Sequence, residues 1–184
     1  MRLVYWYLLV LAGLSFLTGG LFVAGADYRY EAIGSNLLED PGFSTHSKSW
    51  QINKKQFMAF SADDNALTMS IPPGKDTVGI SAIQTVKLPA HGLFRLSAEL
   101  NAKNITVLPD TWHGGRLLLI SLSSEGKPLY KNPHVAAKVF ETAGWATESN
   151  VFSINENIKQ VKAGFQLVGL SGELSARNLE LVRV

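Results

Sequence analysis

The chain has 184 residues, no cysteine, and 17 Lys and Arg residues against 15 Asp and Glu residues, a formal net charge of +2. This near balance argues against a nucleic-acid-binding surface, and the lack of cysteine excludes disulfides, thiol nucleophiles and thiolate zinc sites. Residues 27–184 have the size of one ordinary domain with its own hydrophobic core.

Residues 3–26 form an apolar run with no charged side chain. As an α-helix rising about 1.5 Å per residue, the run is long enough to cross a bilayer core of about 30 Å. Aromatic residues lie at both ends, as in the aromatic belts of membrane-spanning helices. We therefore predict a retained, single-pass transmembrane anchor over residues 1–26. Its N-terminus is expected in the cytoplasm, and the following domain on the periplasmic side of the inner (plasma) membrane.

A cleaved secretory signal is the alternative interpretation of the same run. Ala24-Gly25-Ala26 fits a small-residue cleavage site directly before Asp27, and Arg2 supplies a minimal basic region. Against cleavage, the apolar core is longer than the roughly 7–15 residues of an ordinary signal. Both interpretations export the remainder of the chain.

Small residues repeat along one part of the predicted helix. Such residues let transmembrane helices approach closely, so they predict a face that packs against other membrane-protein subunits. The residues of this candidate packing face are Ala12, Ser15, Gly19, Gly20 and Ala24.

Beyond a linker at residues 27–35, alternation of apolar and polar residues is the main pattern. It is clearest in residues 67–71, 93–102 and 161–167, and it predicts strands with one buried face. The apolar run within residues 116–123 is typical of a strand covered on both faces or lying next to a bulge. Eight or nine short strands separated by turn residues predict an antiparallel β-sandwich.

Two further strands are expected to contain bulges. Alternation in residues 78–86 slips by one position around Ala82-Ile83, and alternation in residues 174–184 slips around Asn178-Leu179. An extra residue inserted in a strand produces such a slip, so we predict a β-bulge at each place.

The segment Asn36-Leu37-Leu38-Glu39-Asp40-Pro41-Gly42-Phe43, with Trp50 seven residues later, resembles the opening of galactose-binding-like jelly rolls. This group includes many carbohydrate-binding modules. Residues 152–181 are similar to the last strands of the same family. The resemblance implies a jelly-roll β-sandwich over residues 36–184, and we expect Trp50 to lie in its core.

The chain departs from that family where a structural calcium is often ligated. Ser44 stands where the family commonly has Glu, and Ala176-Arg177-Asn178 stands where an acidic pair is common. Because a hard cation needs six to eight oxygen ligands, we expect no metal ion here. Glu39 and Asp40, with backbone carbonyls, are the remaining oxygen ligands for the alternative of a retained calcium.

No catalytic constellation is recognisable. The four histidines are scattered without metal-ligand spacing, and neither H-E-x-x-H nor G-x-S-x-G occurs. Carboxylates for glycoside hydrolysis are defined by their separation in space, and nothing in the sequence singles out a pair. We predict a protein that is not an enzyme and carries no cofactor.

Aromatic residues in two loops are the candidates for a ligand site. Flat aromatic rings stack on the C–H faces of sugars, and polar neighbours orient the ligand. Trp112 and His113 lie in one turn-rich segment, and Tyr130 and His134 lie in another expected loop. Trp145 is expected to be structural.

Two functional hypotheses follow. The first is a non-catalytic accessory subunit, whose helix packs into a larger membrane complex while the sandwich braces its periplasmic face. The alternative is a membrane-tethered carbohydrate-binding module for a polysaccharide or glycolipid. The first hypothesis rests on the helix face and the lost metal ligands, and the second on the family resemblance and the loop aromatics.

Overall fold

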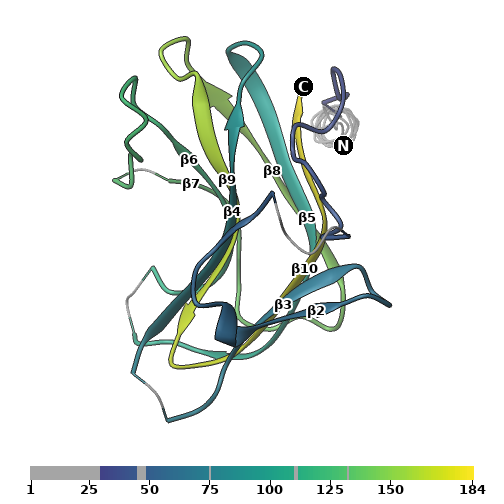
Figure 1. Cartoon of the computed structure of the whole chain (residues 1–184), viewed down its shortest axis with the longest axis vertical. Coiled ribbons are helices and arrows are strands. Elements are labelled where there is room, and N and C mark those ends of the chain that lie inside the picture. Colours follow the sequence, from purple (N-terminus) through teal and green to yellow (C-terminus); the bar gives the residue numbers. More distant parts are fainter. Residues whose placement is uncertain (1–29, 45–48, 75, 110–111, 132) are drawn as a thin grey trace, which may run out of the picture. The chain divides into compact units, whose positions relative to one another are not determined.

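The computed structural model describes residues 30–44, 49–74, 76–109, 112–131 and 133–184, which within these ranges form two five-stranded antiparallel sheets (Figure 1). The first sheet has the order β1-β4-β9-β6-β7 and consists of β1 (Gln51–Ile52), β4 (Val78–Lys87), β9 (Gln160–Gly169), β6 (Gly114–Ser121) and β7 (His134–Val139). The second has the order β2-β3-β10-β5-β8 and consists of β2 (Met58–Ser61), β3 (Ala66–Ile71), β10 (Ser171–Arg183), β5 (Gly92–Thr106) and β8 (Ala146–Ile154). A 3-10 helix, η1 (Lys55–Phe57), precedes β2.

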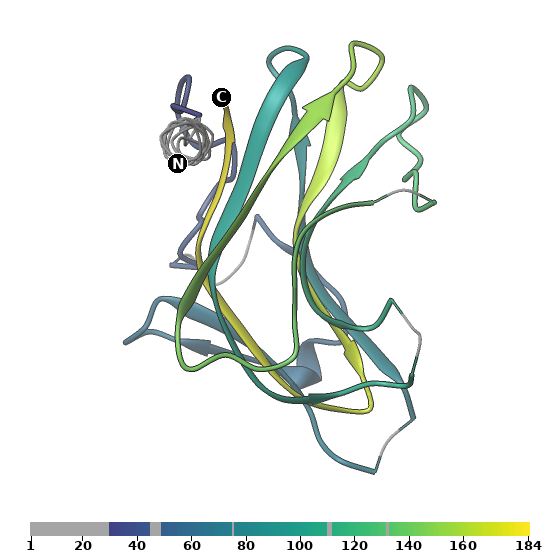
Figure 2. The same ribbon diagram turned by 180° about the vertical axis from the view of Figure 1, so that it is seen from behind.

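The core lies between the two sheets, which face each other in both views (Figures 1 and 2). Alternation predicted the buried faces correctly. The residues of β5 that alternation assigns to the core, Phe94, Leu96, Ala98 and Leu100, are all buried, and so are those of β9, Val161, Ala163, Phe165 and Leu167. The predicted all-β, two-sheet antiparallel sandwich is therefore confirmed.

An aromatic cluster fixes the segment before β1 to the core. The ring centroids of Phe43 and Trp50 lie 5.0 Å apart, and those of Phe43 and Phe165 lie 5.9 Å apart. Trp50 is buried as expected, and its Nε1 donates to the backbone oxygen of Asp40 at 3.1 Å. A buried indole N–H needs such an acceptor.

Asn36 of the family-like opening motif binds β10. Its side-chain amide donates to the oxygen of Leu179 at 2.8 Å, and its Oδ1 accepts from the backbone N–H of Leu38 and of Leu181. The backbone N–H of Ile33 also donates to the oxygen of Arg183 at 2.7 Å. The chain entering the domain therefore lies against its last strand.

One predicted bulge is present and the other is absent. The register between β5 and β10 shifts between Arg177 and Glu180, which confirms the bulge at Asn178-Leu179. In contrast, β4 pairs with β9 without a shift from Val78 to Lys87, so the bulge predicted at Ala82-Ile83 is wrong. The apparent slip arises because Gln84 is buried among apolar residues, where its side chain bonds to both the N–H and the carbonyl oxygen of Glu39.

Three strands did not follow from the sequence pattern: β1, β2 and β7. The strand β7 begins at His134, which we had expected in a loop. The strand β6 is buried along its whole length, as its apolar run predicted, and its pairing with β7 shifts between Leu117 and Leu118.

Residues 32–184 form one compact unit of the chain. The predicted anchor at residues 1–26 and its packing face of Ala12, Ser15, Gly19, Gly20 and Ala24 lie outside the described residues. Within the described ranges, no helix has the length and hydropathy needed to cross a bilayer.

Candidate functional site

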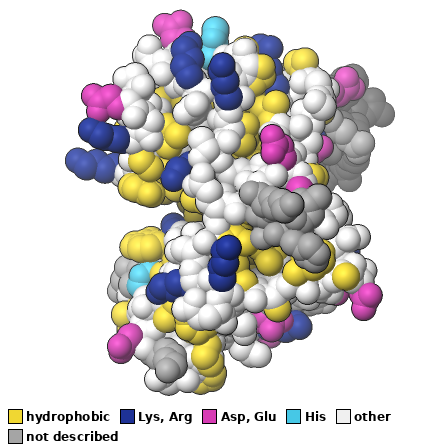
Figure 3. Space-filling view, in the orientation of Figure 1, with side chains coloured by type: hydrophobic (Ala, Val, Ile, Leu, Met, Phe, Trp, Pro, Cys, Tyr) yellow, Lys and Arg dark blue, Asp and Glu magenta, His cyan; other side chains and the backbone are white. Residues whose placement is uncertain are grey.

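A groove with a volume of about 660 Å³ lies on the outer face of the β1-β4-β9-β6-β7 sheet. Figure 3 shows the surface hollowed between the β5–β6 and β6–β7 loops, with hydrophobic side chains on both margins. The described residues lining the groove are Asn53, Ser81, Ile83, Trp112, Arg116, Leu118, Ile120, Tyr130, Lys131, Pro133 and Gln166.

Strand register places a polar row across the floor of the groove. Ser81 of β4 is opposite Gln166 of β9, and Gln166 is opposite Arg116 of β6. The guanidinium Nη2 of Arg116 donates to Oε1 of Gln166. Asn53 closes one end, because its Oδ1 accepts the backbone N–H of Ser81.

The next row of the floor is apolar. Ile83 of β4, Gly164 of β9 and Leu118 of β6 are opposite one another, and Ile120 follows two positions along β6. Alternation directs Leu118 and Ile120 into the groove because Leu117 and Leu119 point into the core. A floor with one polar and one apolar row suits a ligand that has both kinds of surface.

Two exposed aromatic residues form the walls. Trp112 is 57% exposed and precedes β6, whereas Tyr130 is 66% exposed and lies in the β6–β7 loop. Large aromatic rings normally bury most of their surface in a core, so exposed rings that line a groove from two loops indicate a binding surface.

Arg116 joins the floor to one wall. Its guanidinium carbon lies 4.5 Å from the centroid of the Trp112 ring, and the residue is only 8% exposed. Burial lowers the pKa of the Arg116 guanidinium because the charged form is desolvated. Its Nε is buried and has no hydrogen-bond acceptor.

The four sequence-predicted site residues divide into two pairs. Trp112 and Tyr130 both line the groove, whereas the groove lining includes neither His113 nor His134. The ring of His113 lies beside Trp112 at 4.8 Å. His134 is opposite Leu119 in the β6–β7 register and packs at 5.0 Å against the ring of Phe152, on the core side of β7. Burial lowers the pKa of His134 by desolvating its charged form.

The sequence interpretation missed the floor residues, Arg116 and Gln166 above all. Gln166 lies on the polar side of an alternating strand, and Arg116 directly precedes the apolar run of β6. These positions indicate which way the side chains point. The strand pairing that joins them, 50 residues apart, is not visible in the sequence.

The residues weighed for calcium serve the local backbone instead. The N–H and the hydroxyl of Ser44 both donate to Oδ1 of Asp40, at 2.6 and 2.7 Å. Among the described residues, no group of three or more His, Asp or Glu side chains is placed to hold a metal ion.

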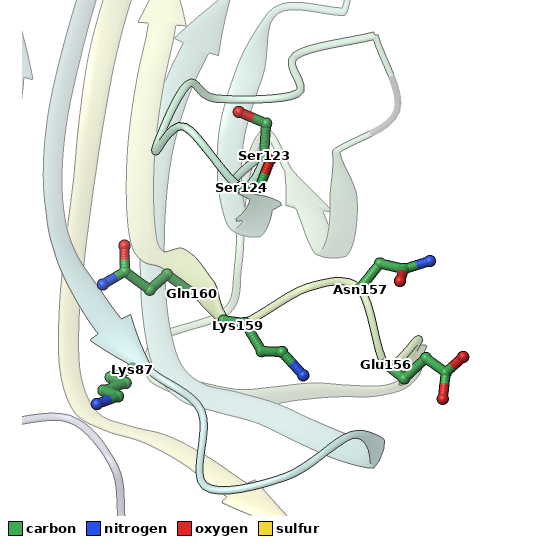
Figure 4. Close-up of a pocket in the computed structure, with 7 residues that line it drawn as sticks. All are labelled: Lys87, Ser123, Ser124, Glu156, Asn157, Lys159 and Gln160. Carbon is green, nitrogen blue, oxygen red and sulfur yellow. The ribbon is translucent and has the colours of Figure 1, made fainter.

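A second depression, near the start of β9, provides a contrast. Figure 4 shows its seven lining residues, whose side chains diverge: Lys87 and Gln160 point to one side, and Glu156 and Asn157 to the other. None of the described residues that line it is aromatic, and all of them except Ser123 are exposed. The groove is therefore the stronger candidate site.

No model of a known protein family matches the chain, and no curated protein matches it in sequence. Solved structures do share its fold. One is the carbohydrate-binding module TmCBM61 in complex with β-1,4-galactotriose, at 16% identity and a TM-score of 0.54, and the match covers 82% of this chain and all of that one.

Two larger proteins contain a similar domain. The enzymatically active domain of tailspike protein 4 from bacteriophage CBA120 is 11% identical with a TM-score of 0.59, and the match covers 81% of this chain and 21% of that one. The CBM22-1–GH10 modules of a Clostridium thermocellum xylanase, complexed with xylohexaose, are 10% identical with a TM-score of 0.54, covering 83% and 29%. At these identities the likeness shows the fold alone, a two-sheet antiparallel β-sandwich.

Proposed function

We propose that residues 32–184 form a non-catalytic carbohydrate-binding module, which holds a glycan in the groove of the β1-β4-β9-β6-β7 sheet. One observation carries the proposal: Trp112 and Tyr130 are exposed and line, from two different loops, a groove whose floor has a polar row. The similar module TmCBM61, solved in complex with β-1,4-galactotriose, supports a binding role for this fold.

The groove matches the chemistry of a sugar ring. Pyranose rings have apolar C–H faces and a polar rim, so they need flat aromatic surfaces together with hydrogen-bonding groups. The indole of Trp112 and the phenol of Tyr130 supply the flat surfaces. Ser81, Gln166 and Asn53 supply donors and acceptors along the floor.

Binding without catalysis is favoured by the residues of the groove. Glycoside hydrolysis generally uses two carboxyl groups that flank the scissile bond. None of the described residues that line the groove is Asp or Glu. The groove therefore offers contacts to a glycan and lacks this pair.

Isothermal titration of the full chain tests the proposal, with β-1,4-galactotriose, xylohexaose and acidic oligosaccharides as ligands. The protein is kept in a detergent without a sugar head group, since a glycoside detergent competes for the site. Trp112→Ala is expected to weaken binding at least about tenfold through loss of ring stacking. Trp145→Ala, which removes a ring on the opposite sheet, is the control and retains binding. Failure of every glycan to bind contradicts the proposal.

Membrane attachment through residues 1–26 and a place in a larger membrane complex stay predictions. Both depend on residues outside the described part of the chain. Within the described part, the observations favour the glycan-binding alternative over the accessory-subunit hypothesis. A tether to the inner membrane is compatible with either function.

A further inference from the structure

We propose that the glycan bound in this groove is acidic, and that Arg116 binds the anionic group of one of its sugar units. The inference rests on the proposed function and names the class of ligand for the same site. The shared chemistry is a carboxylate or a sulfate ester attached to a sugar ring.

Arg116 is a nearly buried cation without a counter-charge in the described structure. Its side-chain contacts are the neutral oxygen of Gln166 and the indole of Trp112, and its Nε has no acceptor. Burying an unpaired charge is costly, so buried arginines usually have carboxylate partners. An anionic group in the groove would supply the missing charge.

The remainder of the lining has the same sign. Lys131 is exposed at the rim beside Tyr130, and the described lining contains no acidic side chain. Two cations facing one hollow produce a positive potential that attracts an anion and disfavours a cation. A neutral sugar gains nothing from this potential.

Arginines on the opposite sheet are paired. Arg95 contacts Glu180 at 2.9 Å, and Arg177 contacts Glu99 at 2.7 Å. Arg177 even repeats the arrangement in the groove, because its guanidinium carbon lies 4.2 Å from the ring centroid of Trp145. Within the described structure, Arg116 therefore differs from Arg177 mainly in having no carboxylate partner.

The distance between Arg116 and Trp112 suits an acidic sugar. A guanidinium forms strong, charge-assisted hydrogen bonds with carboxylate and sulfate oxygens. The guanidinium carbon lies over one face of the indole, 4.5 Å from its centroid, so a sugar that stacks on Trp112 uses the other face, and its acidic substituent extends past the edge of the indole to reach Arg116. The pair is thus suited to bind one sugar unit by both its apolar face and its charge.

Matched glycans test the inference on the full chain in sugar-free detergent. Oligogalacturonate and its methyl ester share a backbone and differ in charge, and a sulfated galactan oligosaccharide is paired with its desulfated form. In low salt, we expect at least one acidic form to bind about tenfold or more tightly than its neutral partner. Comparing the two pairs distinguishes carboxylate from sulfate, and 0.5 M salt is expected to reduce the difference.

Variants locate the effect. Arg116→Met is expected to abolish the preference for the acidic form while binding of the neutral form persists, and Arg116→Lys to restore part of the preference. Lys87→Met/Lys159→Met removes two exposed lysines from the second depression and is the control for general attraction of polyanions. A preference that depends on this control pair, rather than on Arg116, overturns the inference.

The remaining outcomes separate the two proposals. If neutral forms bind as tightly as acidic forms, and Trp112→Ala abolishes that binding, the glycan-binding function stands and the acidic-ligand inference fails. If none of the probes binds, both proposals fail. The matched probes keep the test valid even if an Arg116 variant does not fold, because they need only the unmodified protein.

Discussion

The outer faces of the two sheets differ in whether their arginine side chains form ion pairs. On the β2-β3-β10-β5-β8 sheet, cations and carboxylates of β5 and β10 form three cross-strand ion pairs: Arg95–Glu180, Lys103–Glu173 and Arg177–Glu99. On the β1-β4-β9-β6-β7 sheet, Arg116 has no ion pair among the described residues and lies in a groove between aromatic walls.

On the β2-β3-β10-β5-β8 sheet the cations and carboxylates neutralise one another, whereas on the other sheet the described residues leave the charge of Arg116 without a counter-charge. Cross-strand ion pairs satisfy their own charges and leave little for a ligand. A buried cation with an unused donor carries a desolvation cost that its described neighbours do not offset. We infer that Arg116 in the groove serves ligand binding. The following substitutions test this difference between the two sheets.

The largest effect on folding is expected at the floor of the groove. Gly164 has a φ of +156°, and a Cβ there would lie 2.1 Å from the carbonyl oxygen of Ala82 and 2.9 Å from the Cα of Ile83. Because β4 and β9 must separate to admit it, Gly164→Ala is expected to lower the free energy of unfolding by at least about 3 kcal/mol. Urea denaturation measures the change.

Gly79→Ala is the matched control on the same face. Its Cβ would meet only a methyl group of Val168, at the ordinary contact distance of 3.6 Å. We expect a change within about 0.5 kcal/mol for this variant. Equal losses of unfolding free energy in the two variants would show that the close approach of β4 and β9 at Gly164 does not cause the destabilisation.

The two tryptophans that lie beside arginines should differ in their effect on stability. Trp145 is half-buried against Arg177, whereas Trp112 is largely exposed beside Arg116. Trp145→Ala is expected to cost about 1–2 kcal/mol of unfolding free energy, and Trp112→Ala about 0.5 kcal/mol or less. Thermal or urea unfolding measures this difference in stability. Glycan affinity is expected to differ the other way, with the larger loss in Trp112→Ala. A Trp112 variant that is the less stable of the two would indicate a structural role for this residue.

Removing each arginine tests the pairing directly. Arg177→Met removes the ion pair with Glu99 and leaves this carboxylate the hydrogen bond from Asn178, so it is expected to lower the free energy of unfolding by about 1 kcal/mol. Arg116→Met removes a desolvated charge that has no carboxylate partner among the described residues, so the stability of this variant should stay within about 0.5 kcal/mol of the parent. A large loss from Arg116→Met would place this residue among the supports of the fold.

The smallest effect concerns acid stability on the paired face. Hydrogen bonds from Asn178 and Arg177 lower the pKa of Glu99. The folded state therefore holds this carboxylate ionised, and its stabilising contribution is present at neutral pH. This contribution is lost as the pH falls from about 4.3, the ordinary pKa of a glutamate side chain, down through the lower pKa that Glu99 has in the folded state. Glu99→Gln should therefore lose less stability than the parent over that range. Urea denaturation between pH 6 and 3 measures this, and an unchanged slope of unfolding free energy against pH would argue against the contribution of Glu99.

Period-two alternation predicted the sandwich because one buried face leaves a local signal in each strand. It failed at Ala82-Ile83 because Gln84 occupies a core position, where backbone groups of a distant segment satisfy its amide. It also missed β7, since His134 reads as a polar loop residue although it packs on the core side. A buried polar side chain is explained by partners that the local sequence does not show.

The candidate site was predicted only in part for a related reason. Trp112 and Tyr130 stand out in turn-rich segments, so their place at the groove could be anticipated from the local sequence. Arg116 and Gln166 meet through the pairing of β6 with β9, and register is a property of two strands together. The groove itself depends on both loops lying over one sheet, which no single segment determines.

The chain entering the domain also has a mechanical consequence. The strand β3 pairs with β10 only from Gly172 to Ala176, and beyond that point Ile33, Asn36 and Leu37 bond to the exposed edge of β10. Tension applied through residue 32 along this edge loads these bonds together, in shear, instead of opening them one at a time. The load enters the sheet opposite the groove, so the domain can be pulled from its N-terminal side without the force passing through its binding surface.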